Sequence, residues 1–390
     1  MTAAPRTRDP SQAVSVASEL ARDFAVRAGD HDRDASFPFE NFDLLHQSGL
    51  LNLTVPTEFG GMGAGLSVTC KVVEEIARGD ASTALVYAMH VIYHAVFGRA
   101  RRWPAAQHER LCRDSLDGVA LINVMRVEPE LGTPARGGLP ATTATRTPDG
   151  WRLDGHKIYA TGSPLLRYFL VWARTAVDGD ETPRVGYFLV PNDLAGISIV
   201  ETWNHLGMRA TGSHDLILDG VALPADHALD VRLPGEWSPP DPNLAGWNTL
   251  ILTALYHGVA RTGRDWLVQY LHDRVPTNLG APLATLPRFQ SAVGEIDALF
   301  YASDRLIYGL TAEIDQGNVH ASSKASVVKY VATNNAIRAV DIALGLIGNP
   351  GLSRSNPLER HHRDVLCSRI HTPQDDMILL ATGRAALGVT

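Results

Sequence analysis

Cysteine is scarce in this chain, with 3 residues among 390. Cys70, Cys112 and Cys367 lie far apart and form no closely spaced pair, so neither a disulfide framework nor a zinc knuckle is expected. His90 and His94 have the spacing of a metal-binding pair on a helix, but no acidic third ligand lies near them in the sequence. We therefore expect no metal, and a cytoplasmic protein from a reducing compartment.

Long apolar runs and basic clusters are also missing. No stretch approaches the roughly 20 apolar residues that span a bilayer. The N-terminal segment MTAAPRTRDPSQ lacks the apolar core of a signal peptide. Lys and Arg total 35 against 42 Asp and Glu, for a formal net charge of -7, and no basic block stands out. We expect neither a membrane partner nor a nucleic-acid partner.

The hydrophobic pattern that is present divides the chain into three parts. Residues 1–117 have the apolar spacing of helices and predict an N-terminal all-α domain. Residues 118–232 hold short runs rich in Val, Ile, Thr, Tyr and Phe, bounded by turn residues, which predict a β-barrel or β-sandwich domain. Residues 233–390 return to helical spacing and predict a C-terminal four-helix bundle. The predicted fold class is α+β.

Within the third part, four segments have helical spacing. They run over about 245–274, 286–315, 322–346 and 374–387. The first three are long, and long helices joined by short loops favour an antiparallel arrangement.

Six short motifs occur in a particular order between about residue 40 and residue 390. They are Val55-Pro56 with Phe59-Gly60-Gly61-Met62-Gly63, Glu74-Glu75-Ile76-Ala77-Arg78-Gly79-Asp80-Ala81-Ser82, Arg126-Val127-Glu128-Pro129-Glu130-Leu131-Gly132-Thr133, Trp151 through Gly162, Leu206-Gly207-Met208-Arg209 through Pro224, and Arg363-Asp364. Each is weak alone, but together they resemble the acyl-CoA dehydrogenase superfamily, including its flavin-dependent monooxygenase branch. The resemblance implies an acyl-CoA dehydrogenase-like fold, a flavin cofactor and a small-molecule substrate.

The resemblance also assigns residues to the flavin. Val124–Thr133 is similar to the T-E-P-x-x-G-S loop that wraps the flavin ring, and Tyr159-Ala160-Thr161 takes the place of W-I-T. By that likeness, Thr161 would hydrogen-bond near N5, Tyr159 would pack against the ring, and Arg274 would contact a pyrophosphate across a subunit boundary. The residues so assigned are Arg126, Val127, Gly132, Thr133, Tyr159, Ala160, Thr161, Arg274, Gln374 and Asp376.

The cofactor is left open between FMN and FAD. The R-x-x-F-G motif of the family is not intact after Arg274, because Asn278-Leu279-Gly280 follows two residues late. Gly345 stands where the dehydrogenases carry a glutamine that touches the dinucleotide part of FAD. The adenine half of FAD therefore has less support than the ring half.

The general base of a dehydrogenase is missing from both positions where the family carries it. An acyl-CoA dehydrogenase needs a carboxylate to remove the proton alpha to a thioester carbonyl. In most members this is a glutamate eight residues after the Asp of R-D, and that count reaches Thr372 here. A minority carry it on the first bundle helix, where 253–258 contains no carboxylate. Asp375 or Asp376 could substitute, although both also fit the first turn of a helix.

A histidine occupies the turn instead. His371 stands where dehydrogenases have the tyrosine of Y-E-G, and Asn123 precedes the flavin loop as in the monooxygenase branch. An imidazole that titrates near neutrality suits hydrogen bonding to an oxygen species beside reduced flavin. We predict His371, His90, Asn123 and Ser163 as the catalytic set.

Three functions remain open at this point. The first is a monooxygenase that uses reduced flavin from a reductase or another electron-transfer partner. The second is a dehydrogenase of an acyl thioester with an unrecognised base, and the third is a silent member that only binds flavin or serves as an assembly partner. The resemblance further implies a homotetramer, because the family builds part of its flavin site from a neighbouring subunit.

Overall fold

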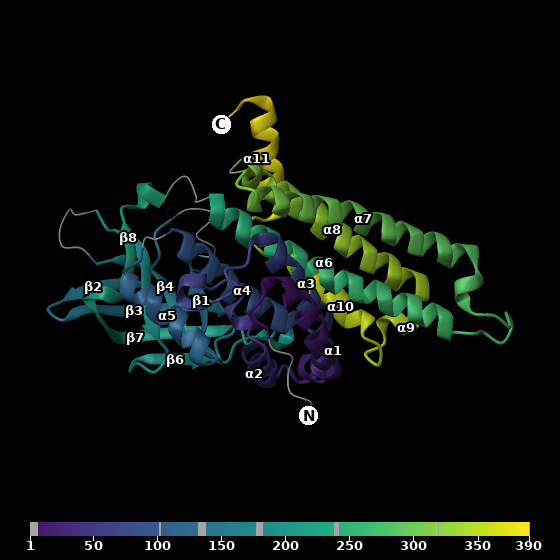
Figure 1. Cartoon of the computed structure of the whole chain (residues 1–390), viewed down its shortest axis with the longest axis horizontal. Coiled ribbons are helices and arrows are strands. Elements are labelled where there is room, and N and C mark those ends of the chain that lie inside the picture. The colour runs from purple at the N-terminus through teal and green to yellow at the C-terminus, as the bar shows by residue number, and fades with distance from the viewer. Residues whose placement is uncertain are drawn as a thin grey trace.

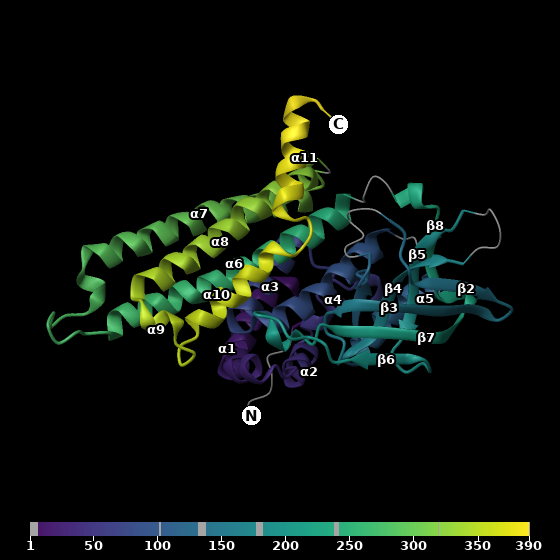
Figure 2. The ribbon, with the colours of Figure 1, turned by 180° about the vertical axis from the view of Figure 1, so that it is seen from behind.

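Three blocks of secondary structure follow one another along the chain. The computed structural model describes residues 7–100, 103–131, 138–176, 182–237, 242–318 and 320–389. Figure 1 shows the sheet at one end of the molecule, the long C-terminal helices extending to the other end and the N-terminal helices between them, and Figure 2 shows the same arrangement from behind. The α+β fold class predicted from the sequence is confirmed.

The N-terminal helices pack between the sheet, which α4 contacts at β1, and the C-terminal helices, which α3 and α4 contact. They are α1 (Pro10–Asp34), α2 (Phe39–Gln47), α3 (Leu66–Gly79), α4 (Ala81–Ala100) and α5 (Ala105–Asp117), with short turns η1 (Leu50–Asn52) and η2 (Thr57–Phe59). Asp80 caps α4, since its carboxylate accepts hydrogen bonds from the amides of Ser82 and Thr83 at 3.3 and 2.9 Å. The nearly all-apolar α4 is buried between other helices, which is why its sequence shows no polar face.

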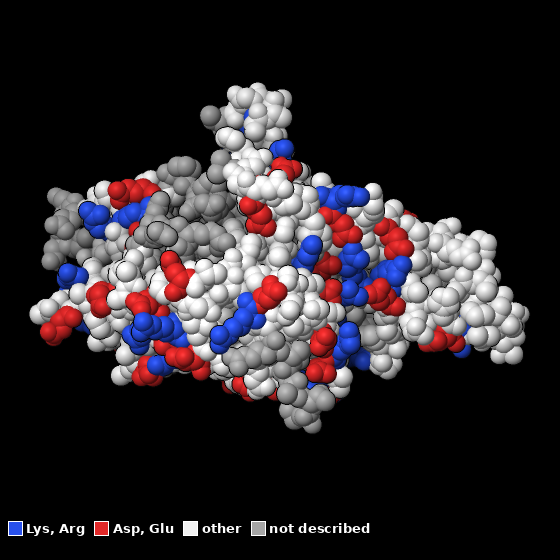
Figure 3. Space-filling model, in the orientation of Figure 1, with Lys and Arg blue, Asp and Glu red and all other residues white. Residues whose placement is uncertain are grey.

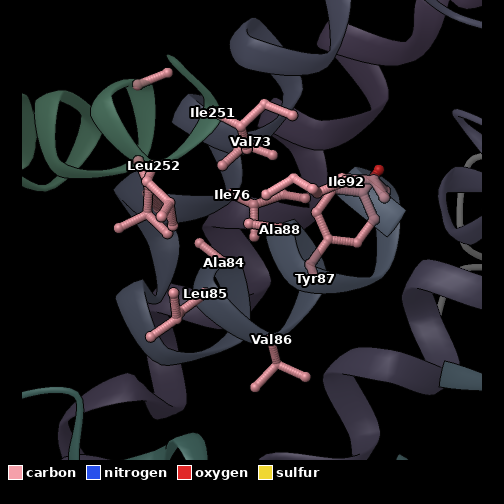
Figure 4. Close-up of a cluster of buried hydrophobic side chains, with 14 of the residues drawn as sticks. Val73, Ile76, Ala84, Leu85, Val86, Tyr87, Ala88, Ile92, Ile251 and Leu252 are labelled. Atoms are coloured by element: carbon pink, nitrogen blue, oxygen red, sulfur yellow. The ribbon is translucent and has the colours of Figure 1, made fainter. Parts of the chain in front are cut away.

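The core of the molecule joins this region to the C-terminal helices. Figure 4 shows Val73 and Ile76 of α3, Leu85 and Ala88 of α4 and Leu252 of α6 packed into one cluster. This cluster contains side chains from helices near both ends of the chain. Burial of their apolar surface therefore stabilises the packing of the two helical regions against each other.

The central sheet contains eight strands in the order β6-β7-β3-β2-β4-β5-β8, and β1 pairs with β4. They are β1 (Leu121–Met125), β2 (Thr143–Thr147), β3 (Gly150–Ala160), β4 (Leu166–Thr175), β5 (Val185–Pro191), β6 (Ile197–Val200), β7 (His214–Pro224) and β8 (Ala228–Arg232). The β1–β4 and β2–β4 pairs are parallel, which the hairpin-like turn pattern did not indicate. The parallel pairing places the ends of β1 and β4 at the same edge of the sheet.

The C-terminal bundle consists of α6 (Pro242–Asp273), α7 (Pro287–Asp315), α8 (Ala325–Ile347) and α10 (Leu358–Leu366), with the short α9 (Asn349–Leu352) before α10. The last helix, α11 (Asp375–Leu387), stands away from this bundle in both views (Figures 1 and 2). Its first turn contacts α8, where Asn334 Nδ2 donates to Asp375 at 2.9 Å. Leu379, Leu380 and Leu387 remain more than half exposed along it.

The Arg363-Asp364 motif fastens the three regions together. Arg363 donates to both carboxylate oxygens of Asp32 on α1, at 2.9 and 2.6 Å, and to Glu359 within α10. Asp364 accepts the amide of Met208, in the loop before β7, at 2.7 Å. Burial raises the pKa of Asp364 to about 7, although this amide bond opposes the rise. The motif is therefore a structural junction.

Acidic and basic side chains are interspersed on the face shown in Figure 3. No helix within the described residues has both the length and the apolarity needed to cross a bilayer.

Buried histidines make stability depend on pH. Burial lowers the pKa of His90 and His371 to about 4 and that of His361 to about 3, with nearby positive charges adding to the effect for the last two. An unfolded imidazole titrates near 6.5, so the unfolded chain binds more protons than the folded one between about pH 4 and 6.5. Asp364 acts in the opposite direction, because its raised pKa favours the folded state at low pH.

We expect the free energy of unfolding to fall as the pH drops from 7 to 5. On unfolding, these three histidines and His94, whose pKa burial also lowers, take up more protons than Asp364 releases, and a net uptake of one or two protons corresponds to roughly 1–3 kcal/mol per pH unit. Urea titrations at pH 7, 6 and 5 measure this slope. His361→Gln should flatten it, while His362→Gln, a partly exposed control on the same helix, should not. Stability that is constant or rising from pH 7 to 5 would contradict the assignment.

Candidate active site

A cavity of about 170 Å³ lies where the three regions meet. Its walls come from α4, the end of β1 and the loop after it, the end of β3, the start of α6 and the segment before α11. The lining residues are Met89, Tyr93, Val124, Arg126, Val127, Ile158, Tyr159, Asn248, Leu252, His371 and Thr372. Four of the residues predicted from sequence, Arg126, Val127, Tyr159 and His371, are thus brought together.

A buried ion pair anchors the loop that carries Arg126 and Val127. Lys157 on β3 is fully buried, and its Nζ donates to Glu128 Oε1 and to the Trp172 carbonyl, each at 2.6 Å. Burial lowers the pKa of Lys157 to about 8. Burial alone would raise the pKa of Glu128, but hydrogen bonds from Lys157 and Thr142 outweigh it and lower that pKa. The loop is thereby fixed to the sheet directly beside the cavity.

Tyr159 forms a wall of the cavity with unusual backbone geometry. Its φ is +59°, in the left-handed region, and 52% of its surface is exposed. Its ring meets the rings of Trp203 and His205 edge-on, and these two stack at 3.6 Å between centroids. Residues with such strained backbone cluster at active sites and ligand-binding sites.

The hydroxyls that follow Tyr159 are engaged within the protein. Thr161 Oγ1 shares a hydrogen bond with Ser213 Oγ at 2.9 Å, and Ser163 Oγ donates to the Gly212 carbonyl at 2.7 Å. Asn123 Nδ2 donates to the Thr161 carbonyl at 2.9 Å. These side chains join the end of β3 to its neighbours, and none belongs to the lining set.

His371 enters the cavity from the bundle side. Its ring lies 5.7 Å from that of Tyr256, whose hydroxyl is buried without a hydrogen-bond partner in the described part of the chain. Behind it, the fully buried Lys329 donates weakly to the Ser368 carbonyl at 3.4 Å. Burial and, secondarily, the Lys329 charge lower the pKa of His371 to about 4. The imidazole is therefore neutral at pH 7, with one ring nitrogen that donates and one that accepts a hydrogen bond. The titration near neutrality expected from the sequence is thus wrong, because burial disfavours the charged form.

No carboxylate belongs to the described lining of this cavity. Thr372, at the usual position of the base, faces it, and Tyr256, from the alternative position on α6, contacts His371. Of the two possible substitutes, Asp375 accepts from Asn334 and Asp376 is exposed, and neither lines the cavity.

Several predicted residues lie elsewhere. His90 is fully buried, its Nε2 bonds the Leu51 carbonyl at 2.9 Å, and its Nδ1 accepts the Ile122 amide. Ala160 is buried in the β3–β7 pairing, and Arg274 is exposed just after α6.

The remaining predicted residues lie away from the cavity, near α11 or outside the described residues. By the rise of an α-helix, Arg274 is about 30 Å along the axis from Leu252 at the cavity. Gln374 precedes α11 and Asp376 lies in its first turn, close after His371 in the sequence. Gly132 and Thr133 lie outside the described residues.

The structure adds residues that the sequence did not indicate. They are Met89 and Tyr93 from α4, Asn248 and Leu252 from α6, and Lys329 behind His371. Tyr93 lies in an apolar helix whose sequence predicts only a buried core helix, and Asn248 lies in no recognisable motif. Only the tertiary arrangement of α4 against α6 and the sheet brings them to one cavity.

The lining suits a flat heteroaromatic group such as a flavin ring. Tyr159 and aliphatic side chains provide apolar walls, and Arg126, Tyr93 and Asn248 present polar groups for which no hydrogen-bond partner occurs among the described residues. Few, convergent polar groups on an apolar wall are characteristic of cofactor and substrate sites.

The chain matches three family models. They are described as acyl-CoA dehydrogenase, N-terminal domain, over residues 11–100, middle domain over 125–221, and C-terminal domain over 246–387. The putative acyl-CoA dehydrogenase YdbM of Bacillus subtilis (strain 168) is 32% identical over 362 residues, which cover 92% of each protein. The amino sugar nitrososynthase RubN8 of Streptomyces rubradiris is 30% identical over 364 residues, covering 89% of this chain and 82% of that protein.

A solved structure is also similar. KijD3 in complex with FMN and dTDP-3-amino-2,3,6-trideoxy-4-keto-3-methyl-D-glucose has a TM-score of 0.85 and 26% identity, covering 99% of this chain and 96% of that one.

Proposed function

We propose that this chain, which belongs to the acyl-CoA dehydrogenase family, is a flavin-dependent monooxygenase of a small organic substrate. The chain is a flavin-dependent oxidoreductase of that family, with FMN or FAD as cofactor. The proposal concerns the finer question of which oxidation it performs. It includes the cytoplasmic location that the three unpaired cysteines favour.

The observation that carries this proposal is a cavity with a histidine and no carboxylate in its described lining. Desaturation of an acyl thioester requires a strong enough base within hydrogen-bond reach of the alpha proton. A neutral imidazole whose pKa is about 4 is a weak base, and threonine at the usual base position is none at all. The same imidazole is well suited to donate a hydrogen bond to an oxygen atom in an otherwise apolar site.

In this mechanism the bound flavin supplies the electrons that activate molecular oxygen. Tyr159, held by His205, and the loop fixed by Glu128 and Lys157 would orient the flavin ring. His371 holds a hydrogen bond at the reacting oxygen, and the apolar side chains of α4 and α6 exclude water. A preorganised donor in a site shielded from water is worth far more than the same donor in solution.

One relative supports oxygen insertion, and a similar structure supports a site for FMN with a small organic ligand. The name of RubN8 describes formation of a nitroso group on an amino sugar, and such a group contains an oxygen atom that an amine lacks. KijD3 binds FMN together with an amino-keto sugar nucleotide. We infer by likeness that this chain uses reduced flavin delivered by a reductase or another electron-transfer partner.

An acyl-CoA dehydrogenase with a non-standard base is the second candidate. It is favoured by the 32% identity to YdbM and by the retained Glu128-Pro129 of the flavin loop. A silent member that only binds flavin would show no turnover with any electron source.

We expect a homotetramer, or at least a dimer. Arg274 lies far from the cavity of its own chain, and α11 exposes Leu379, Leu380 and Leu387 on a helix that stands away from the bundle. A second copy that covers this helix would bury apolar surface, at about 25 cal/mol per Å². Light scattering measures the mass, and Leu380→Glu should lower it. A stable monomer with full flavin affinity would contradict the expectation.

Oxygen uptake discriminates the candidate functions. We expect the protein supplied with reduced FMN or FAD to consume oxygen and to transfer one oxygen atom to a member of a panel of amines, sulfides and phenols, as detected by mass spectrometry. Reduction of bound flavin by acyl-CoA thioesters, without oxygen transfer, would instead establish the dehydrogenase.

A further inference from the structure

Arg126 brings a positive charge into the cavity that no carboxylate of the described lining balances. The residue is half-buried, and its guanidinium lies 5.2 Å from the centre of the Trp172 ring. Its Nε is buried and makes no hydrogen bond within the described ranges. A cation withdrawn from water without a hydrogen-bonding partner costs free energy. A negatively charged ligand beside Arg126 would offset that cost.

Tyr93 stands beside this charge. Burial raises the pKa of its hydroxyl, while the positive charge of Arg126 acts in the opposite direction. The hydroxyl is therefore protonated at neutral pH, and no hydrogen bond to it occurs in the part of the chain that the structure describes. The guanidinium fork and one O–H donor thus face the same cavity, and a guanidinium can bond both oxygens of a carboxylate.

The other buried cations near the site are engaged differently. Lys157 is paired with Glu128, and Lys329 donates to the Ser368 carbonyl and is not part of the lining. His371 is neutral at pH 7. Within the described lining, Arg126 is therefore the charge that a ligand meets.

We propose that Arg126 and Tyr93 form an anion receptor in the cavity, and that the substrate carries a carboxylate that they bind. This assignment of substrate class rests on the function proposed above. Arg126 and Tyr93 require a ligand with a planar, negatively charged group. A substrate carboxylate is such a group, and the pyrimidine edge of reduced flavin is another. The experiment separates these two sources.

Benzoate and benzamide are suitable probes, because they share size and shape and differ in charge. We titrate each into the protein with oxidised FMN bound and follow the flavin absorbance. Wild type should bind benzoate at least tenfold tighter than benzamide, and Arg126→Gln should remove that preference, since a hydrogen bond to a charged group is worth about tenfold or more. Arg126→Lys should restore part of it. Arg146→Gln is the matched control, because Arg146 also stacks on a tryptophan, at 4.6 Å, but lies outside the lining.

The second arm compares the affinities of wild type and Arg126→Gln for oxidised and reduced FMN. A loss confined to reduced FMN, with no preference for benzoate, assigns the receptor to the flavin and overturns the substrate carboxylate. Equal binding of benzoate and benzamide together with equal affinities for both flavin states overturns the receptor altogether. Absence of FMN binding means that the proposed function has failed. The receptor is then tested by whether benzoate raises the melting temperature of the flavin-free protein more than benzamide does.

Discussion

Replacing Lys157 by methionine is expected to lower the free energy of unfolding by about 3–5 kcal/mol, because the substitution leaves Glu128 buried without its cation. The Nζ of Lys157 is fully buried and lies 2.6 Å from Glu128 Oε1. Methionine fills a similar volume, so the loss comes from the uncompensated carboxylate more than from a cavity. Urea unfolding at pH 7, followed by far-UV circular dichroism, measures the difference.

A matched control lies on the same strand. Arg152 and Asp154 of β3 form an ion pair at 3.0 Å with both side chains more than a third exposed. Arg152→Met should therefore cost less than about 1 kcal/mol. The double variant Lys157→Met with Glu128→Gln should recover part of the lost stability, since the buried charge is then removed along with its partner. Equal stability of Lys157→Met and Arg152→Met would show that the buried pair contributes nothing beyond an exposed one.

The loop that Glu128 anchors carries Arg126 and Val127, so the same substitution has a consequence at the cavity. In Lys157→Met the unpaired Glu128 carboxylate is more stable in contact with water, so the loop would move away from β3. We therefore expect flavin affinity to fall together with the free energy of unfolding. A variant that is destabilised yet binds flavin normally would separate the anchor from the site.

The order of helices, strands and helices was readable from hydrophobic periodicity, because burial imposes period 3.6 or 2 on each element. Two features were not readable. Helix α10 has only nine residues and a strongly charged sequence, LERHHRDVL, so its pattern is too short to stand out. The parallel pairing of β1 with β4 joins residues about 45 positions apart, and no local turn signal encodes it.

Only part of the candidate site could be predicted from the sequence, because the site also depends on contacts between residues far apart in the chain. Arg126, in a loop, and Tyr159, at the end of β3, occur in recognisable motifs, whereas Tyr93 and Asn248 lie on helices where nothing local distinguishes them. His90 shows the converse. Its type and position suggested chemistry, but its ring nitrogens bond the Leu51 carbonyl and the Ile122 amide, as a satisfied core histidine does. Sequence identifies residue types, and only the packing of α4 against α6 decides which of them share a cavity.

Replacing His371 by alanine is expected to uncouple oxygen consumption from substrate oxidation. Reduced flavin would still react with oxygen, but product would fall about 10²- to 10³-fold and hydrogen peroxide would appear in its place, since removal of one preorganised donor costs about 3–4 kcal/mol. Peroxide and product formed per reduced flavin consumed, for wild type and variant, measure the effect. His362→Ala is the matched control, because this neighbouring histidine pairs with Asp341 at the surface and lies outside the cavity lining.

The pH dependence tests the same role independently. The pKa of His371 is lowered to about 4, so the imidazole stays neutral throughout the range from pH 6 to 8. Coupling in wild type should therefore be flat across that range and decline only as the pH approaches 5 and protonation begins. A change in coupling with a midpoint near pH 6.5 would mean that His371 titrates like an exposed histidine and that its charged form takes part in the reaction. An unchanged peroxide yield in His371→Ala, with the fold intact, would remove this histidine from the reaction and return the second candidate, the dehydrogenase, to first place.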